Sequence, residues 1–246
     1  MAGGSAADRY AGTVCEHGGM SGSATISTTA DWGLSPSPAG PVTAFIVPGI
    51  VSAAVLVVLG TLVSWMVGLL VGALVLFGWT TAILTAGKRL LRSVKARPPK
   101  DEEAARVRNI LEGLAPEGPA LWVIDDERPN ALVAWSGGPH IAVTTGLTTG
   151  FTRTETEAVV AHCLARIRSG EARTTTYLGG ALLPKPLQVG IPHDVSAAAL
   201  TRYPPGLAAA LGKCVPLRSG WSYAWLVGEP PSHLATAERI AALGDL

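Results

Sequence analysis

The segment Glu155-Thr-Glu-Ala-Val-Val-Ala-His-Cys-Leu-Ala-Arg-Ile167 gives the strongest indication of the fold. Its apolar residues recur at helical spacing, which predicts an amphipathic helix. Those residues are Val159, Val160, Leu164 and Ile167. Thr154 is a good N-cap residue, and Glu157 three residues later would complete a capping box. We therefore expect a helix that begins at Thr154 and ends near Gly170.

Shorter elements flank this helix on both sides. Upstream, the apolar pattern predicts a helix over residues 101–114 and three strands. The strands should cover residues 121–124, 131–134 and 141–145, with a Ser136-Gly-Gly-Pro139 turn between the last two. Downstream, helices are expected over residues 195–200, 205–213 and 235–243. This order predicts an α+β domain over residues 102–246.

Several short motifs in this domain resemble the HtpX-like membrane metalloproteases. Asn130-Ala-Leu is similar to that family's edge-strand Asn-Ala-Phe, and Val143-Thr-Thr-Gly-Leu147 is similar to the strand end that follows it. Val160-Ala-His162 falls where the family has its zinc-binding helix. Downstream, Asp194-Val-Ser-Ala-Ala, Ser232-His233 and Glu238-Arg239-Ile240 resemble later segments of the family. The resemblance implies a zincin-like domain with a small sheet and several helices.

Catalysis in this family depends on a His-Glu-x-x-His helix. Two histidines at i and i+4 share one helical face and bind Zn²⁺, and the glutamate beside the first acts as general base. A carboxylate from a later helix is the third ligand, and the metal activates a bound water. The resemblance places the first ligand on His162, the base on Cys163, the second ligand on Arg166 and the third on Gly190. Only His162 keeps its role.

The replacements oppose a zinc site. A guanidinium is permanently protonated, so Arg166 cannot bind a metal and repels a dication. Cys163 could bind metal as a thiolate, but adjacent residues on a helix do not face the same side. The same geometry disfavours Cys163 as a nucleophile with His162 as its base, and favours burial of the thiol. We therefore expect no cofactor.

Two further hypotheses concern the vacated site. In one, His162, His193, Asp194 and His233 regroup around a metal, which would then be zinc; otherwise these histidines are ordinary surface or hydrogen-bonded residues. In the other, Arg166 fills the site and pairs with Asp194, which in the family is a group that orients a ligand.

An apolar segment precedes the domain. No charged residue occurs from Val42 to Ala86, whereas a helix needs about 20 residues to cross a bilayer. We predict a transmembrane hairpin over residues 43–87, with spans near 43–62 and 66–86; one long, tilted helix is the alternative. Ser64, Gly68 and Gly72 lie four residues apart, a spacing of small residues that lets helices approach closely.

Basic residues cluster directly after this segment, in a predicted juxtamembrane linker over residues 88–101. They are Lys88, Arg89, Arg92, Lys95, Arg97 and Lys100, whereas the region before the hairpin has only Arg9. Because basic residues stay on the cytoplasmic side, we expect a multi-pass protein of the cell membrane whose C-terminal domain is cytoplasmic. A patch that contacts anionic lipids would lie on the same side.

The remaining sequence and the composition limit other functions. Residues 1–42 are rich in small residues and proline without apolar periodicity, which predicts a disordered tail. The net charge of +1, without a basic helix, argues against nucleic acid as a partner. Cys15, Cys163 and Cys214 are scattered, as expected of reduced thiols rather than of a disulfide framework.

Three functions follow from these observations. The first is a catalytically inactive pseudopeptidase, in membrane-protein quality control, whose old substrate groove along the Asn130 edge strand pairs with a peptide or protein partner. The second is an active zinc metalloendopeptidase with non-standard ligands that acts on membrane or misfolded proteins. The third is a membrane-assembly subunit in which the hairpin matters most. The bilayer is a partner in each, and the sequence leaves the oligomeric state open.

Overall fold

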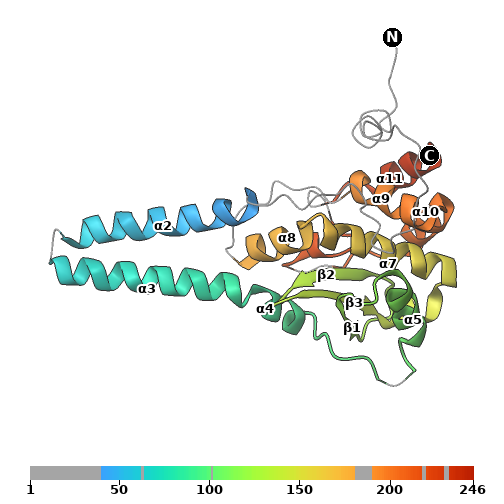
Figure 1. Cartoon of the computed structure of the whole chain (residues 1–246), viewed down its shortest axis with the longest axis horizontal. Coiled ribbons are helices and arrows are strands. Elements are labelled where there is room, and N and C mark those ends of the chain that lie inside the picture. Colours follow the sequence, from blue (N-terminus) through green and yellow to red (C-terminus); the bar gives the residue numbers. More distant parts are fainter. Residues whose placement is uncertain (1–39, 62–63, 101, 181–189, 218–219, 230–232) are drawn as a thin grey trace, which may run out of the picture.

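The computed structural model describes residues 40–61, 64–100, 102–180, 190–217, 220–229 and 233–246. Most of the predicted disordered tail therefore lies outside the described residues. The described residues form a helical hairpin that projects from a mixed domain of helices and a three-stranded sheet (Figure 1).

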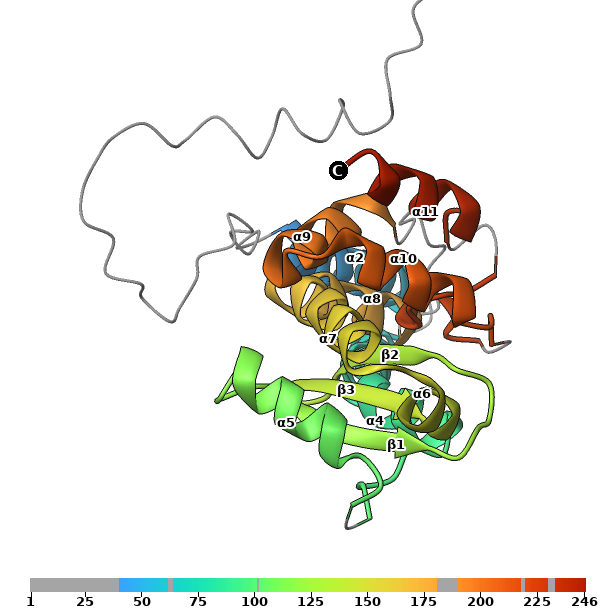
Figure 2. The same ribbon diagram turned by 90° about the vertical axis from the view of Figure 1, so that its right-hand side faces the viewer.

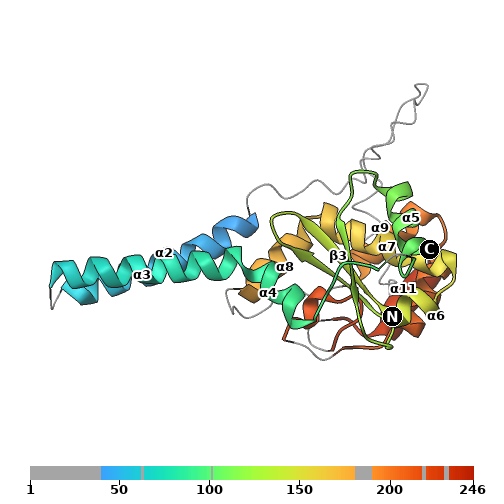
Figure 3. The ribbon, with the colours of Figure 1, turned by 90° about the horizontal axis from the view of Figure 1, so that it is seen from below.

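The hairpin consists of α2 (Gly40–Thr61) and α3 (Trp65–Leu84), which lie side by side in Figures 1 and 3. Small residues let the two helices approach, as predicted for membrane helices. A side chain on Gly60 would overlap the backbone of Gly68, and one on Gly72 would overlap Val57. Among the described residues, α3 is long and apolar enough to cross a membrane, whereas the apolar stretch Val47–Thr61 of α2 is shorter.

Helix α4 (Ala86–Ser93) follows α3 after Thr85 alone. The sequence predicted a linker here, but Leu90 and Leu91 are buried and pack with Leu132 against the sheet. Gly87 lies so close to the carbonyl of Trp135 that a side chain there would overlap it. The apolar pair explains why this short, basic segment is helical: it buries one face against the domain.

The sheet contains β1 (Ala120–Ile124), β2 (Ala131–Trp135) and β3 (Pro139–Thr144) in the order β1-β3-β2. β3 runs parallel to β1 and antiparallel to β2. Alternate residues face two cores, since successive side chains of a strand point to opposite faces. One set, including Val133 and Ile141, packs in the large core with α5 and α7, and the other set packs with α4.

The helices of the domain surround this sheet, and Figure 2 shows α7 between the sheet and the pair α9 and α10. Their bounds are α5 (Ala105–Leu114), α6 (Thr145–Gly150), α7 (Arg153–Arg168), α8 (Glu171–Gly180), α9 (Ile191–Thr201), α10 (Pro204–Lys213), the 3-10 turn η1 (Ser222–Ala224) and α11 (Thr236–Gly244). The predicted α+β order is therefore present, whereas α6 and α8 were not predicted.

The start of α7 differs from the prediction by two residues. Thr152, not Thr154, is the N-cap, and Glu155 closes the capping box in place of Glu157. Both pairs have the Thr-x-x-Glu spacing. Glu155 also pairs with Lys213 of α10, at 2.7 Å, and this tertiary contact favours the earlier cap.

Candidate functional site

Helix α7 carries His162 and Arg166 one turn apart, so their side chains share one face. Both are buried, at 0% and 1% exposure. The helix lies in the middle of the domain, packed against the sheet, α9 and α10 (Figure 2). The two positions that the resemblance assigns to zinc ligands are therefore adjacent and shielded from solvent.

Asp194 on α9 faces His162. Its carboxylate accepts two hydrogen bonds from Arg239 of α11, both at 2.7 Å, and its Oδ1 lies 2.9 Å from Nδ1 of His162. Arg239 also donates to the carbonyl of Leu226. Burial alone would raise the pKa of Asp194, but the hydrogen bonds and charges of Arg239 and His162 together outweigh it and hold that pKa well below its usual range. Asp194 is thus a charged carboxylate with a fixed partner.

His162 is neutral in this setting. Burial lowers its pKa to about 4, despite the opposing effect of Asp194. Its Nε2 is buried and has no hydrogen-bond partner among the described residues. The ring of His193 lies edge-on to it, with 6.2 Å between ring centroids.

Arg166 does not pair with Asp194, so that hypothesis was wrong. Its guanidinium binds Glu171, with 2.8 Å between Nη2 and Oε1. The remaining donors go to backbone carbonyls: Nη1 donates to Ala224 and Trp225, and Nη2 donates to Tyr223. All five N–H groups of an arginine are thereby used, because Nε also donates to Glu171.

Glu171 opens α8 and completes this ion pair. Burial would raise the pKa of Glu171, but the charges of Arg166 and His193 and the hydrogen bonds from Arg166 together outweigh it and lower that pKa. His193 adds a contact, since its Nε2 lies 3.1 Å from Oε2 of Glu171 and 3.0 Å from Oγ of Ser169. Burial lowers the pKa of His193. The second ligand position of the family is therefore a filled ion-pair site that links α7, α8 and η1.

The other two family positions also lack the required groups. Cys163 is buried in the apolar core, where burial raises the pKa of its thiol to about 12. Gly190 is the N-cap of α9, and a side chain there would meet Leu234. The base position therefore holds a protonated thiol, and the space of the third ligand is taken by leucine.

The regrouping of histidines is not observed in the described parts of the chain. Nε2 of His233 forms a hydrogen bond with the carbonyl oxygen of Trp225, at 2.9 Å, and burial lowers the pKa of His233 to about 4. Both oxygens of Asp194 bind Arg239. No three His, Cys, Asp or Glu side chains among the described residues are grouped to hold a metal. With a saturated cation at one ligand position, these residues do not fit zinc.

The Asn130 edge strand is present but already paired. Asn130 is 0% exposed, and its side chain donates to the carbonyl of Val227 at 2.7 Å and accepts from the N–H of the same residue. The N–H of Leu226 donates to the carbonyl of Ala131, at 2.7 Å. Residues 225–227 therefore lie along the outer edge of β2 like an extra strand. The expected groove at Asn130 is not open in this structure.

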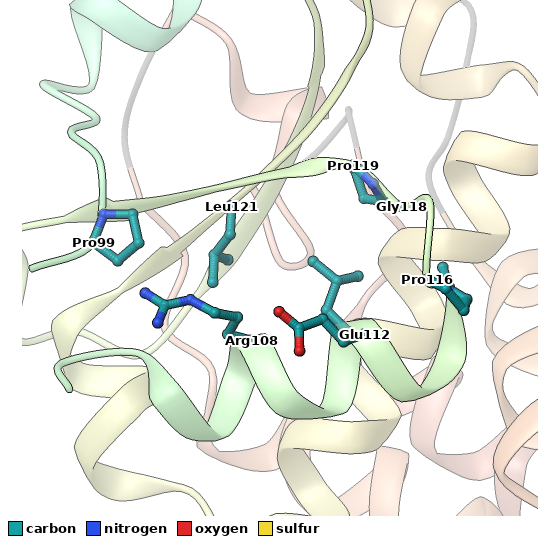
Figure 4. A pocket seen from close by; sticks show the side chains of 9 residues that line it. Pro99, Arg108, Glu112, Pro116, Gly118, Pro119 and Leu121 are labelled. Carbon is teal, nitrogen blue, oxygen red and sulfur yellow. The ribbon is translucent and has the colours of Figure 1, made fainter. Parts of the chain in front are cut away.

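A separate cavity of about 320 Å³ lies between α5 and β1 (Figure 4). Arg108, Glu112, Leu121 and Pro99 are among the residues that line it. It holds no histidine or cysteine and lies apart from His162, so it is not part of the family's site.

Sequence reasoning missed Glu171 and Arg239 as members of the site. Arg239 was noted only as part of the Glu238-Arg239-Ile240 motif, which was the available signal. No pattern in the sequence indicated Glu171 as part of the site, because α8, the helix that it begins, was not predicted. The carbonyl partners of Arg166 depend on the path of η1, which no side-chain pattern indicates.

Comparisons with curated proteins confirm the predicted resemblance. The chain is 28% identical over 121 residues to a protease HtpX homolog of Levilactobacillus brevis, covering 46% of this chain and 41% of the relative. A homolog of Ligilactobacillus salivarius is 35% identical over 83 residues, covering 31% and 28% of the two chains. One of Dictyoglomus turgidum is 27% identical over 201 residues, covering 60% and 66%.

The matched segments therefore span between 28% and 66% of the lengths of these relatives. No protein-family model matches the chain, and no solved structure matches it.

Proposed function

We propose that this HtpX-like chain is a membrane-anchored pseudopeptidase, which keeps a peptidase-related fold, binds a peptide or protein partner and does not catalyse hydrolysis. The observation that carries the proposal is Arg166. A buried guanidinium at the second ligand position, with every donor used, offers no lone pair to a metal and repels a dication.

The base position supports the same proposal. A general base must lie within hydrogen-bond reach of the water that it activates and must have a suitable pKa. Cys163 points into the apolar core, and its raised pKa keeps it protonated near neutral pH. Neither proton transfer nor water activation is available from this residue.

The paired edge of β2 indicates how a partner would bind. Edge strands accept extended peptides through backbone hydrogen bonds. The carbonyl of Ala131 already holds Leu226 in that way, and the side-chain amide of Asn130 holds Val227. In our proposal a partner peptide displaces this segment and takes over the same hydrogen bonds. The partner is therefore an extended chain rather than a folded surface.

The hairpin provides the membrane anchor in this proposal. Large apolar side chains on both helices are exposed, including Val58 at 64% and Phe77 at 72%. Exposed apolar surface of this extent marks a membrane or protein contact. In this proposal the C-terminal domain and both ends of the hairpin lie in the cytoplasm, which the basic residues after α3 support.

Metal content tests the proposal. The full chain is purified in detergent without chelators or a metal-binding tag, and zinc is measured by elemental mass spectrometry. We expect less than about 0.1 zinc per chain, because a structural or catalytic site would hold close to one. Hydrolysis of unfolded casein is measured in parallel, with His162→Ala as the control for contaminating proteases. Near one zinc per chain, or hydrolysis that His162→Ala abolishes, would refute the proposal.

An active zinc metalloendopeptidase is the alternative, and one observation favours it. Nε2 of His162, Nδ1 of His193 and Nδ1 of His233 are buried without hydrogen-bond partners among the described residues. Unused imidazole nitrogens are potential ligands. If zinc is found, these three residues are the first to replace, and loss of zinc with each would identify the ligands.

A further inference from the structure

We propose that Lys88 and Arg92 on the outward face of α4, together with Lys95 in the turn that follows this helix, bind the anionic headgroups of membrane lipids. The inference rests on the proposed anchoring by the hairpin and deepens it, because it assigns the protein a preferred lipid class. The three residues are called the basic face below.

The path of the chain places this face at the end of the apolar hairpin. Thr85 alone separates α3 from α4, and the backbone bonds Thr85 N to Thr81 O and Arg89 N to Thr85 O, both 2.9 Å, continue the helical path across it. Figure 3 shows α4 at the domain end of the hairpin. When α3 spans the hydrocarbon, the first turns of α4 therefore lie at the level of the headgroups.

Packing fixes the direction of the basic face. Leu90 is 0% exposed and Leu91 is 7% exposed, and both pack against the sheet. Gly87 touches the end of β2. Helix α4 therefore cannot roll about its axis, and Lys88, Arg92 and Lys95 remain exposed on the side away from the domain.

These cations have no counter-ion within the described protein. No carboxylate there pairs with Lys88, Arg92 or Lys95, whereas the nearby Arg97 is neutralised by Glu103 and Asp125, each at 2.6 Å. Arg89 is not counted, because its guanidinium donates to the carbonyl of Ala82 and caps α3.

The adjacent helix α8 adds no negative charge. Its one acidic residue, Glu171, is bound to Arg166, and its Arg173 is exposed over the rings of Trp135 and Tyr177. The surface beside the base of the hairpin is therefore positive without compensation.

An anionic lipid surface supplies the missing charge. A basic residue near such a surface gains about 1 kcal/mol, which is about a fivefold preference over a zwitterionic surface for each residue. Three residues would give on the order of 100-fold if their contributions add. The apolar hairpin holds the face at the bilayer surface, which favours lipid headgroups over a soluble anion as the ligand.

The test uses the full chain in vesicles of phosphatidylcholine with a minor fraction of phosphatidylglycerol. After mild extraction, native mass spectrometry measures the ratio of the two lipids that remain bound, relative to the vesicles. We expect strong enrichment of phosphatidylglycerol for the wild type. The triple variant K88Q/R92Q/K95Q should lower this enrichment at least about tenfold.

The matched control R108Q/R153Q/R202Q removes three charges elsewhere in the domain, at the half-buried Arg108 and at the exposed Arg153 and Arg202, and should keep the enrichment of the wild type. Equal enrichment in the wild type and K88Q/R92Q/K95Q, or an equal loss in the control, would overturn the inference. Extraction of the vesicles at alkaline pH is done in parallel. A chain that leaves the membrane there refutes the hairpin anchor itself, whereas a chain that stays without lipid preference refutes only the basic face.

Discussion

Two buried arginines organise the polar interior of the domain, and each neutralises one carboxylate. Arg239 binds Asp194, and Arg166 binds Glu171, with all four side chains at 11% exposure or less. Burying a charge is costly unless it is paired and its remaining groups are hydrogen-bonded, and the carbonyls of Leu226 and η1 meet that requirement. These two ion pairs thus cross-link α7 to α8 and α9 to α11.

Replacement of Arg166 tests this view. Arg166→Met would leave Glu171 buried without the guanidinium and would remove the donors that Arg166 gives to three carbonyls, so we expect a loss of about 3–5 kcal/mol in the free energy of unfolding. Denaturant unfolding of the full chain in detergent measures it. Arg153→Met, at an exposed position, is the control and should change stability by less than about 0.5 kcal/mol. A similar small change for Arg166→Met would show that the ion pair contributes nothing.

The buried histidines predict a dependence of stability on pH. His162 and His233 have an ordinary pKa of 6.5 that is lowered to about 4 in the folded protein. Between these values the unfolded chain binds protons that the folded chain does not. Their contribution is therefore complete above pH 6.5 and falls as the pH is lowered towards 4, by up to about 3 kcal/mol each.

Unfolding of the full chain at pH 7 and pH 5 measures this effect. His233→Gln removes one titrating group, so its stability should fall less between the two values. The carboxylates Asp194 and Glu171 do not affect this comparison. Because their pKa values are lowered in the folded protein, the stability that they contribute is lost only at a pH more acidic than 5. A wild-type stability that is flat from pH 7 to pH 5 would contradict the prediction.

The sequence indicated part of this cluster of buried polar residues, whereas Glu171 and the role of Arg239 were missed. His162, Arg166 and Asp194 followed from the motifs in the sequence. Which carboxylate each arginine binds depends on where α8 and α11 begin and how they approach α7. That geometry arises from packing between elements, which the pattern of single residues does not encode.

Helix α7 illustrates how local signals and tertiary contacts combine at the scale of an element. The sequence offered two Thr-x-x-Glu pairs, two residues apart, and the structure uses Thr152 with Glu155. The existence of the helix was predictable from its apolar period. Its first residue was not, because the choice between equivalent caps depends on Lys213 of another helix.

The two threonines provide a matched pair of variants. Thr152→Ala removes the side-chain oxygen that accepts from the N–H of Glu155, and should destabilise the domain by about 1 kcal/mol. Thr154→Ala should cost clearly less, because Thr154 lies inside the first turn. Thermal unfolding of both variants compares them directly. A larger loss of stability for Thr154→Ala than for Thr152→Ala would show that Thr154 is the N-cap, as the sequence predicted.

At the scale of the whole molecule, hairpin and domain meet through α4. The sequence predicted apolar helices followed by a basic linker, and the helical positions agree with α2 and α3. The first part of the predicted linker is helical in α4, and the burial of Leu90 and Leu91 against the sheet stabilises this short helix. The parallel pairing of β1 with β3 was likewise not evident from strand patterns, which do not specify which strands are neighbours.

Gly87 is the tightest point of this junction. Gly87→Ala would push a methyl group into the carbonyl of Trp135, so we expect a destabilisation of about 1–3 kcal/mol, as in overpacked cores. Gly113→Ala, in α5 with open space around it, is the control and should be neutral or stabilising by up to about 1 kcal/mol. Thermal unfolding in detergent distinguishes them. An equal change in thermal stability for the two variants would show that α4 can shift to accommodate the added methyl group.

The continuous path from α3 through Thr85 into α4 has a mechanical consequence. A helix whose apolar stretch is longer than the bilayer is thick responds by tilting. Because α4 is docked on the sheet, a tilt of α3 would swing the whole domain, so that its angle to the membrane would follow bilayer thickness. Spin-label distances between the domain and the lipid surface, in bilayers of short and long acyl chains, would register this motion; unchanged distances would mean that Thr85 acts as a joint.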